Sequence, residues 1–319
     1  LKVKTIGTSS FEGCQNMVAA TIQILSSGKI GGNAFFKCYK LGSELEILEA
    51  KDRKEDGTLI YSTIGGSAFK SSGIHTIKIP FYIESIGASA FENCTSLSGA
   101  GSLTLKEING NAFKDDNELI LESINATTIQ ASAFENCRKL NADIQLYYYG
   151  NIKKAAFKNC EKLKSLKILY YEEDEVETKD KHEIDELSVI EEEAFYRSGL
   201  KGALIIPITV IVIGKNAFAH CKSLTSLTIN GCDDDKLILK IREKAFYRSG
   251  LNGKLTLPYS AAYVGDYAFA YCPINQLEIH GTDHSFEVLL GVKEKPDGTQ
   301  EEVKQQIDKQ SFIGKYSFY

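Results

Sequence analysis

The 319-residue sequence predicts a β-rich repeat fold, a right-handed solenoid of about twelve coils with a parallel sheet on one face and β-hairpin insertions. Three observations predict it. The phrase Ile-x-x-x-Ala/Ser-Phe returns along the whole chain, most often 21–24 residues after the previous copy. A second phrase, Leu-x-x-Leu-x-Ile, follows the phenylalanines. Long connections interrupt this repeat at four places, always at the same point of the coil.

The first phrase places one phenylalanine in each coil. The small alanine or serine before it suits a tight turn where the backbone enters the core, and the phenylalanine then fills the space between coils. Phe312 and Phe318 are only six residues apart, so they cannot both be the key residue of separate coils, and the sequence leaves open which one carries the last coil. The phenylalanines are Phe11, Phe35, Phe69, Phe91, Phe113, Phe134, Phe157, Phe195, Phe218, Phe246, Phe269, Phe312 and Phe318.

The second phrase predicts a short strand in each coil. Alternation over Leu-x-Ile, as in Leu227-Thr-Ile229, is typical of a strand with one buried and one exposed face. One such strand per repeat, always in the same position, indicates parallel strands stacked on those of neighbouring coils. A single coil cannot bury its apolar face, so stacking must form one continuous core.

Cysteine recurs three residues after the phenylalanine. The other coils carry serine or aspartate there, so the position is small and we expect it to hydrogen-bond a backbone group of the turn. Stacked coils lie about 4.8 Å apart with parallel Cα–Cβ vectors, which do not converge to the roughly 3.8 Å that a disulfide prefers. We therefore expect a structural row of buried free thiols, formed by Cys14, Cys38, Cys94, Cys137, Cys160, Cys221 and Cys272.

Four insertions lie near 48–63, 170–188, 230–240 and 280–306, each between a Leu-x-Ile strand and the next isoleucine phrase. We expect all four to leave the solenoid on the same side. Asp56-Gly57 and Asp297-Gly298 predict hairpin turns in the first and the last of them. The insertion at 170–188 holds nine acidic residues and two lysines, which is consistent with a solvated loop or with a patch for cations or a basic partner.

The combined phrase Ile-Gly-x-x-Ala-Phe-x-x-Cys-x-x-Leu-x-x-Leu-x-Ile resembles the BspA-like leucine-rich repeat of surface proteins from anaerobic bacteria and parasitic protists. A variant with Ser-Gly in place of Cys occurs in AFYRSGL at 194–200 and 245–251. The resemblance covers the chain and implies one solenoid domain over 1–319, an extracellular or cell-surface location, and adhesion, typically to extracellular-matrix proteins. Because the sequence starts and stops within repeat phrases, we expect it to be a fragment of a longer chain.

Other function classes find little support in the residues. A net charge of −5 gives no general reason to bind nucleic acid, and no apolar run approaches the roughly 18 residues of a membrane-spanning helix. The sequence lacks the nucleophile, phosphate-loop, zinc-protease and dinucleotide motifs. His280 and His284 have no third ligand at a suitable spacing. We expect no catalytic, cofactor or metal site, and hence no enzyme.

A protein partner fits the exposed surfaces best. The middle residues of the Leu-x-Ile strands point away from the core and form a mixed polar row without the aromatics that nucleic acid would need. Interfaces depend on aromatic or arginine anchors, so we expect the insertions to supply affinity and the strand face to supply shape. The candidates are Tyr61, Tyr170, Tyr171 and Phe286 in the insertions, with Lys78, Gln145, Lys167, Thr228 and Glu278 on the strands. The alternative is a structural spacer or stalk that presents another domain.

Overall fold

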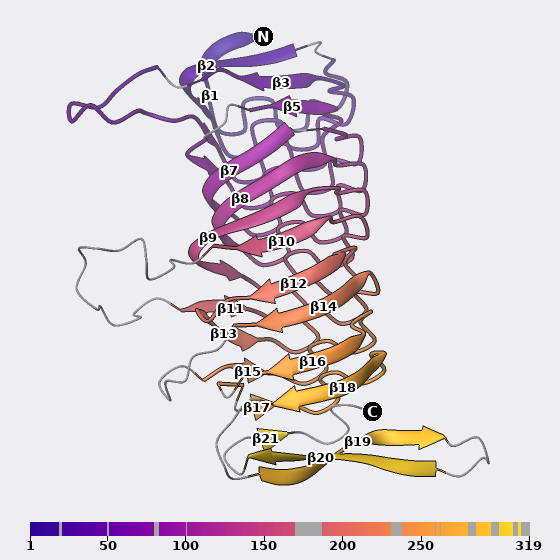
Figure 1. The fold of residues 1–319 in the computed structure, drawn as a ribbon. Coiled ribbons are helices and arrows are strands. Elements are labelled where there is room, and N and C mark those ends of the chain that lie inside the picture. Colours follow the sequence, from indigo (N-terminus) through magenta and orange to yellow (C-terminus); the bar gives the residue numbers. More distant parts are fainter. Residues whose placement is uncertain are drawn as a thin grey trace.

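The chain winds into a parallel-stranded β-solenoid of about 11 turns, shown in Figure 1. The computed structural model describes residues 1–18, 21–49, 51–79, 83–99, 101–169, 187–230, 238–258, 260–261, 263–279, 285–294, 300–308 and 312–313. Within these ranges there is no helix. The predicted fold class is therefore confirmed.

Every coil has a strand that ends at the isoleucine of the first phrase, or at Val264 in one coil. These strands are β1 (Lys2–Ile6), β2 (Thr21–Ile30), β4 (Thr63–Ile64), β6 (Ser85–Ile86), β7 (Gly101–Ile108), β8 (Leu121–Ile129), β9 (Asp143–Ile152), β11 (Ser188–Ile190), β13 (Val210–Ile213), β15 (Lys240–Ile241), β17 (Tyr263–Val264) and β21 (Phe312–Ile313). Their last residues pair in register from Ile6 to Ile313, so one ladder runs the length of the solenoid.

The Leu-x-Ile phrases form a second set of strands, which Figure 1 shows one above another. They are β3 (Glu44–Ile47), β5 (Thr76–Lys78), β10 (Ser165–Ile168), β12 (Gly202–Ile206), β14 (Leu224–Ile229), β16 (Gly253–Leu257) and β18 (Ile274–Ile279); β2, β7, β8 and β9 are long enough to include both phrases. The expectation that all of them share one sheet is wrong, because β12–β14 and β16–β18 pair separately. Gly202 and Gly253, with φ of +76° and +73°, begin β12 and β16, and the register shifts directly after each.

Phenylalanines form the centre of the core. From Phe11 to Phe269 the ring centroids of successive coils lie 5.0–5.3 Å apart, and the ring planes differ by 2–11°. All of these rings except that of Phe11 are fully buried. The stacked isoleucines and leucines of both strand sets surround this row. The repeat therefore builds one continuous core along the solenoid.

Both hairpins predicted from Asp-Gly are present. In the first insertion Arg53 and Leu59 form an antiparallel bridge, and Asp56 accepts hydrogen bonds from the amide and hydroxyl of Thr58. In the last insertion β19 (Ser285–Glu294) pairs antiparallel with β20 (Gln300–Asp308). Ile307 lies within this hairpin, whereas Ile313 pairs with Val264. Ile313 therefore begins the last coil, and Phe312 pairs with Tyr263 in β21 rather than following a turn; Phe318 lies outside the described residues.

Candidate functional site

The turns around the phenylalanines present an edge of the solenoid to solvent. In each turn the residues two before and two after the phenylalanine have φ between 53° and 70°, as in Asn216 and His220 around Phe218. The phenylalanine amide donates to the carbonyl of the alanine in the next coil at 2.6–2.9 Å, from Phe11–Ala34 to Phe246–Ala268. These two features hold successive turns in one orientation, so that the first and second residues after each phenylalanine form two rows along the edge.

Cysteine side chains lie directly inside these turns. Each thiol beyond the first coil donates to the phenylalanine carbonyl of an earlier coil, for example Cys160 Sγ to Phe134 O at 2.9 Å and Cys221 Sγ to Phe195 O at 3.0 Å. All seven motif cysteines are free. Burial raises the pKa of Cys221 to about 12, so this thiol stays protonated. Two members differ from the expected buried row, because Cys14 is exposed and Cys272 is half-buried.

Serine or aspartate replaces the cysteine in four turns. Ser198 Oγ lies 3.2 Å from Cys221 Sγ, so a hydroxyl continues the polar row. Asp116 is fully buried, accepts a 2.7 Å hydrogen bond from the Cys94 amide through Oδ1, and has no partner for Oδ2 among the described residues. Desolvation raises the pKa of Asp116 well above its usual value. This side chain is thus a neutral acid at pH values where a solvated aspartate is ionised.

Between the Phe69 and Phe157 coils, the polar side chains of the edge form ion pairs and hydrogen bonds with one another. Lysines pair with glutamates of the next coil: Lys70–Glu92 at 2.9 Å, Lys114–Glu135 at 2.9 Å and Lys158–Glu193 at 2.7 Å. In the neighbouring row, Asn136 donates to Asp115 and accepts from Asn159. We call this part of the surface the paired edge, and it consists of Lys70, Ser71, Glu92, Asn93, Lys114, Asp115, Glu135, Asn136, Lys158 and Asn159.

From the Phe195 coil onward, aromatic and arginine side chains take the same positions. Four rings contact edge to face: Tyr196–His220 at 5.4 Å, His220–Tyr247 at 5.6 Å and Tyr247–Tyr271 at 5.4 Å between centroids. Two guanidinium groups lie over these rings. We call this surface the aromatic edge, and it consists of Tyr196, Arg197, His220, Tyr247, Arg248 and Tyr271.

Positive charge is fixed on the aromatic edge. The Arg197 guanidinium lies 5.3 Å from the Tyr196 centroid, and that of Arg248 lies 5.3 Å from Tyr247 and 5.1 Å from Tyr271. Both arginines are exposed, and Tyr271 is 50% exposed. Burial, and then the charges of Arg197, Arg248 and Lys222, lower the pKa of His220, so its ring is neutral over a wider pH range than usual.

The aromatic edge was not predicted from the sequence. Anchors were expected on the strands and in the insertions, whereas the residues after each phenylalanine were expected only to form a turn. The signal was nevertheless present, because AFYRSG occurs twice and AFAH and AFAY occupy the same positions of other coils nearby. Four coils with an aromatic ring just after the phenylalanine indicate a continuous row once the coils are stacked.

Each strand-face candidate pairs with the middle residue of a neighbouring Leu-x-Ile strand: Lys78 with Glu46, Gln145 with Lys167, Thr228 with Ile205 and Glu278 with Thr256. Lys167 and Thr228 are exposed. Lys78 forms an ion pair with Glu44, and Glu278 forms one with Lys254. Thr104, the middle residue of Leu103-Thr-Leu105, is buried and accepts a hydrogen bond from Asn125. Most charges of this face therefore have partners within the solenoid.

The insertion candidates are only partly visible. Tyr61 is half-buried at the base of the first hairpin. Tyr170 and Tyr171 lie outside the described residues, as do His280, His284 and the acidic segment of the second insertion. Phe286 belongs to β19, and its side chain is likewise outside the description. These residues remain predictions from the sequence.

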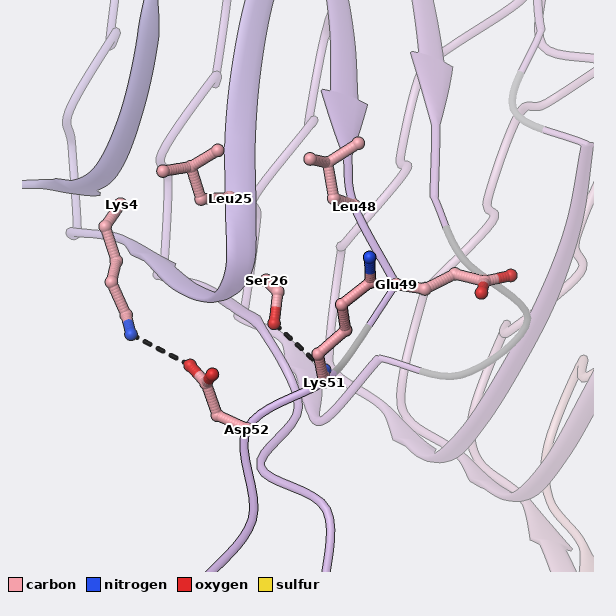
Figure 2. A pocket seen from close by; sticks show the side chains of 7 residues that line it. All are labelled: Lys4, Leu25, Ser26, Leu48, Glu49, Lys51 and Asp52. Carbon is pink, nitrogen blue, oxygen red and sulfur yellow. Dashed lines mark hydrogen bonds and ion pairs between the residues drawn. The ribbon is translucent and has the colours of Figure 1, made fainter.

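An open pocket lies where the first insertion leaves the solenoid, as Figure 2 shows. Lys4 forms a 2.9 Å ion pair with Asp52, and Ser26 Oγ accepts from the Lys51 amide. Hydrogen bonding from Lys4 lowers the pKa of the Asp52 carboxyl. The lining is Lys4, Leu25, Ser26, Leu48, Glu49, Lys51 and Asp52. These contacts attach the hairpin to the first coils, and in them Lys4 and Asp52 compensate each other's charge.

The described ranges contain no three metal-binding side chains gathered together, and no helix in them is long and apolar enough to span a bilayer. The most distinctive exposed surface of these ranges is the aromatic edge, where rings and arginines are displayed at the spacing of the coils.

Comparison with known proteins agrees with this architecture. The BspA type leucine rich repeat region matches residues 1–52, 62–175 and 181–287 in 6 copies. No curated protein matches the chain. A leucine rich cell surface protein from Faecalibacterium prausnitzii has a similar structure, with 21% identity over 74% of this chain and 69% of its own, and a TM-score of 0.47.

Two further solved structures are similar at a comparable level. A leucine-rich repeat protein from Bacteroides ovatus shares 22% identity over 85% of this chain and 68% of its own, with a TM-score of 0.46. The pneumococcal vaccine antigen PcpA shares 20% identity over 83% and 63%, with a TM-score of 0.35. Likeness at this level says nothing about a ligand, whereas the family match covers most of the chain. The chain belongs to the BspA-type leucine-rich-repeat family.

Proposed function

We propose that this chain is a non-enzymatic, extracellular or cell-surface module that binds protein and mediates adhesion to host or neighbouring-cell macromolecules. Proteins of the leucine-rich-repeat class typically bind other proteins and are generally not enzymes. The observation that carries the proposal is the aromatic edge. Tyrosine and arginine are among the residues most enriched at the centres of protein interfaces, and here six aromatic or basic side chains lie together on a row of turns.

Rigidity supports a binding role for this surface. Each side chain of the aromatic edge is attached within two residues of a fully buried phenylalanine, and the amide-to-carbonyl ladder fixes the turn. Ring–ring and cation–π contacts restrict the side chains further, so less conformational entropy is lost when a partner binds. The strand face and the insertions remain secondary candidates. Lys78 and Lys167 represent the first of these surfaces, and Tyr170 and Tyr171 the second.

A structural spacer is the alternative function. Ten steps of 5.0–5.3 Å between Phe11 and Phe269 form a row about 50 Å long, held by continuous ladders of isoleucine and phenylalanine. Such a rod could hold another domain at a distance without any distinctive surface. The aromatic edge favours binding, since a spacer does not require a row of partly exposed tyrosines and exposed arginines.

Binding of the purified chain to immobilised extracellular-matrix proteins, measured by biolayer interferometry, tests the proposal. The edge variant combines Tyr247→Ala with Arg248→Ala. Its matched control combines Phe36→Ala with Lys37→Ala, because this pair has the same turn positions and a similar cation–π contact of 4.9 Å in an earlier coil. We expect the edge variant to weaken binding at least about tenfold and the control to leave it unchanged.

Two further variants locate the site if the edge is not responsible. One deletes 172–186 and carries Tyr170→Ala and Tyr171→Ala, and the other carries Lys78→Glu and Lys167→Glu. A loss confined to the first would assign binding to the insertion, and a loss confined to the second would assign it to the strand face. Failure of the unaltered chain to bind any surface or matrix protein would favour the spacer.

A further inference from the structure

We propose that the aromatic edge captures an acidic, extended segment of its protein partner, with two carboxylates about 10 Å apart held by Arg197 and Arg248. This inference rests on the proposed binding function and specifies its ligand chemistry. It follows from three observations: the charge state of the two edges, the availability of the guanidinium groups, and the distance between them.

The first observation is a difference in charge compensation. On the paired edge each of Lys70, Lys114 and Lys158 has a glutamate of the next coil within 3.0 Å. On the aromatic edge neither Arg197 nor Arg248 has a carboxylate within 4.0 Å among the described residues, and the exposed Lys222 lies on the turn between them. The lowered pKa of His220 follows partly from these same three charges. The solenoid thus leaves a local excess of positive charge here.

The second observation concerns the guanidinium groups themselves. Neither makes a side-chain hydrogen bond within the described part of the chain, and each is held over a tyrosine ring. Guanidinium has a planar fork of donors that matches a carboxylate in a bidentate arrangement. Because the rings already restrict both arginines, binding a carboxylate orders little that is not ordered beforehand.

The third observation is the spacing. Arg197 and Arg248 occupy equivalent positions two coils apart, and each coil advances 5.1 Å at the neighbouring phenylalanines. Their backbones are therefore about 10 Å apart along the solenoid axis. A polyproline II segment rises about 3.1 Å per residue with three residues per turn, so acidic residues at i and i+3 lie on one side about 9 Å apart. Such a segment aligned with the axis matches the two arginines.

The same contacts argue against other polyanions. Guanidinium groups cover faces of Tyr196, Tyr247 and Tyr271, and neighbouring rings pack edge to face, so little open ring surface is left on which a base or sugar could stack. Two arginines and one lysine also form a short patch, whereas nucleic acids and sulfated glycans are bound by longer basic tracts. An acidic protein segment can bind through carboxylates to the two arginines without stacking on the rings.

Fluorescence anisotropy with labelled peptides tests the inference. One peptide contains Glu-Pro-Pro-Glu, and a second of equal composition contains Glu-Glu-Pro-Pro. We expect the first to bind more tightly, and we expect Arg197→Gln and Arg248→Gln each to weaken it about tenfold. Arg248→Lys should recover only part of the loss, since lysine lacks the bidentate fork. The control Lys37→Gln should bind like the unaltered chain, and added salt should weaken binding.

Several outcomes would overturn the inference. Equal binding of both peptides would contradict the spacing, and unchanged binding by the arginine variants would contradict the site. A heparin oligosaccharide that binds more tightly than the peptide and depends on the same arginines would assign the surface to sulfated glycans instead. If the peptides fail while Tyr247→Ala with Arg248→Ala still abolishes binding to a matrix protein, this inference fails and the proposed function stands. If that variant leaves matrix binding intact, the edge assignment in the proposed function fails as well.

Discussion

The paired edge and the aromatic edge are the same part of the repeat in two stretches of one solenoid. In the first, lysine, glutamate and asparagine side chains satisfy one another across coils. In the second, four rings pack edge to face, and two exposed arginines lie over them without carboxylate partners in the described ranges. The phenylalanines beneath both keep a spacing of 5.0–5.3 Å. The buried phenylalanines that stabilise the coils therefore stay the same, while the exposed side chains of the turns differ between the two stretches.

Matched core substitutions should show that the two regions share one scaffold. We expect Phe113→Ala beneath the paired edge and Phe218→Ala beneath the aromatic edge each to lower the free energy of unfolding by about 3–5 kcal/mol, because each removes a fully buried ring and leaves a cavity. Urea unfolding followed by circular dichroism measures both. A large loss for one variant and a small loss for the other would show that the two stretches differ inside as well as outside.

Asp116 makes the interior beneath the paired edge sensitive to pH. Its pKa in the folded chain is raised by burial, so folding favours the protonated acid. Stability is therefore complete below the unfolded pKa of about 3.9 and falls above it by up to about 1.4 kcal/mol per pH unit, until the raised pKa is reached. Asp116→Ser, which introduces the residue of the Ser198 and Ser249 turns, should remove this dependence.

Thermal unfolding at pH 5 and pH 8 measures the effect. The gap between Asp116→Ser and the unaltered chain should widen at the higher pH. The same gap at both values would mean that Asp116 is ionised in the folded state. Ser249→Ala, in a turn beneath the aromatic edge, serves as the control because it changes the same position without a titrating group.

The ion pairs of the paired edge should contribute less. Lys114→Gln should cost about 0.3–1 kcal/mol at low salt and close to nothing at high salt, since Lys114 and Glu135 are partly exposed. Burial acts to raise the pKa of Glu135, but hydrogen bonds from Lys114 and Ser132 together lower it. The contribution of the pair is thus present above pH of about 4.3 and is lost as pH falls through the lowered pKa. Arg197→Gln removes an exposed cation–π contact with Tyr196 but no ion pair, so we expect any loss to stay within about 0.5–1 kcal/mol, and a larger loss would reveal a carboxylate partner for that arginine.

The smallest effect concerns His220. Burial and the charges of Arg197, Arg248 and Lys222 lower its pKa, so the ring contributes stability that is lost as pH falls below the usual value of about 6.5. Replacing both arginines with glutamine should move the His220 titration, followed by NMR, upward toward that value. An unchanged midpoint would mean that burial alone sets the pKa and that the arginine charges are screened at this ring.

Periodicity made most of the fold predictable. Thirteen occurrences of one phrase located the phenylalanine and isoleucine rows, and Asp-Gly located both hairpins. The division of the second strand set into separate sheets was not predictable in the same way. β12 pairs with β14 and β16 pairs with β18 outside the large sheet, and the register shifts after Gly202 and after Gly253. The aromatic edge was missed because an alternation argument applies to strands, and turns have no such rule. The contact between Tyr196 and His220 depends on how neighbouring coils stack, and this cannot be predicted from the sequence of a single coil.

The left-handed turn positions restrict the chemistry that the edge can display. Positive φ is a genuine outlier for a β-branched residue, and none of the non-glycine residues found there is valine, isoleucine or threonine. Serine, asparagine, aspartate, glutamate, lysine, arginine, histidine, tyrosine and, once, alanine fill these sites instead. The backbone thus admits a limited set of residue types, most of which have hydrogen-bonding, charged or aromatic side chains. A combinatorial library that varies these turn positions among the same residue types could direct the surface to new targets, while the phenylalanine row beneath it stays intact.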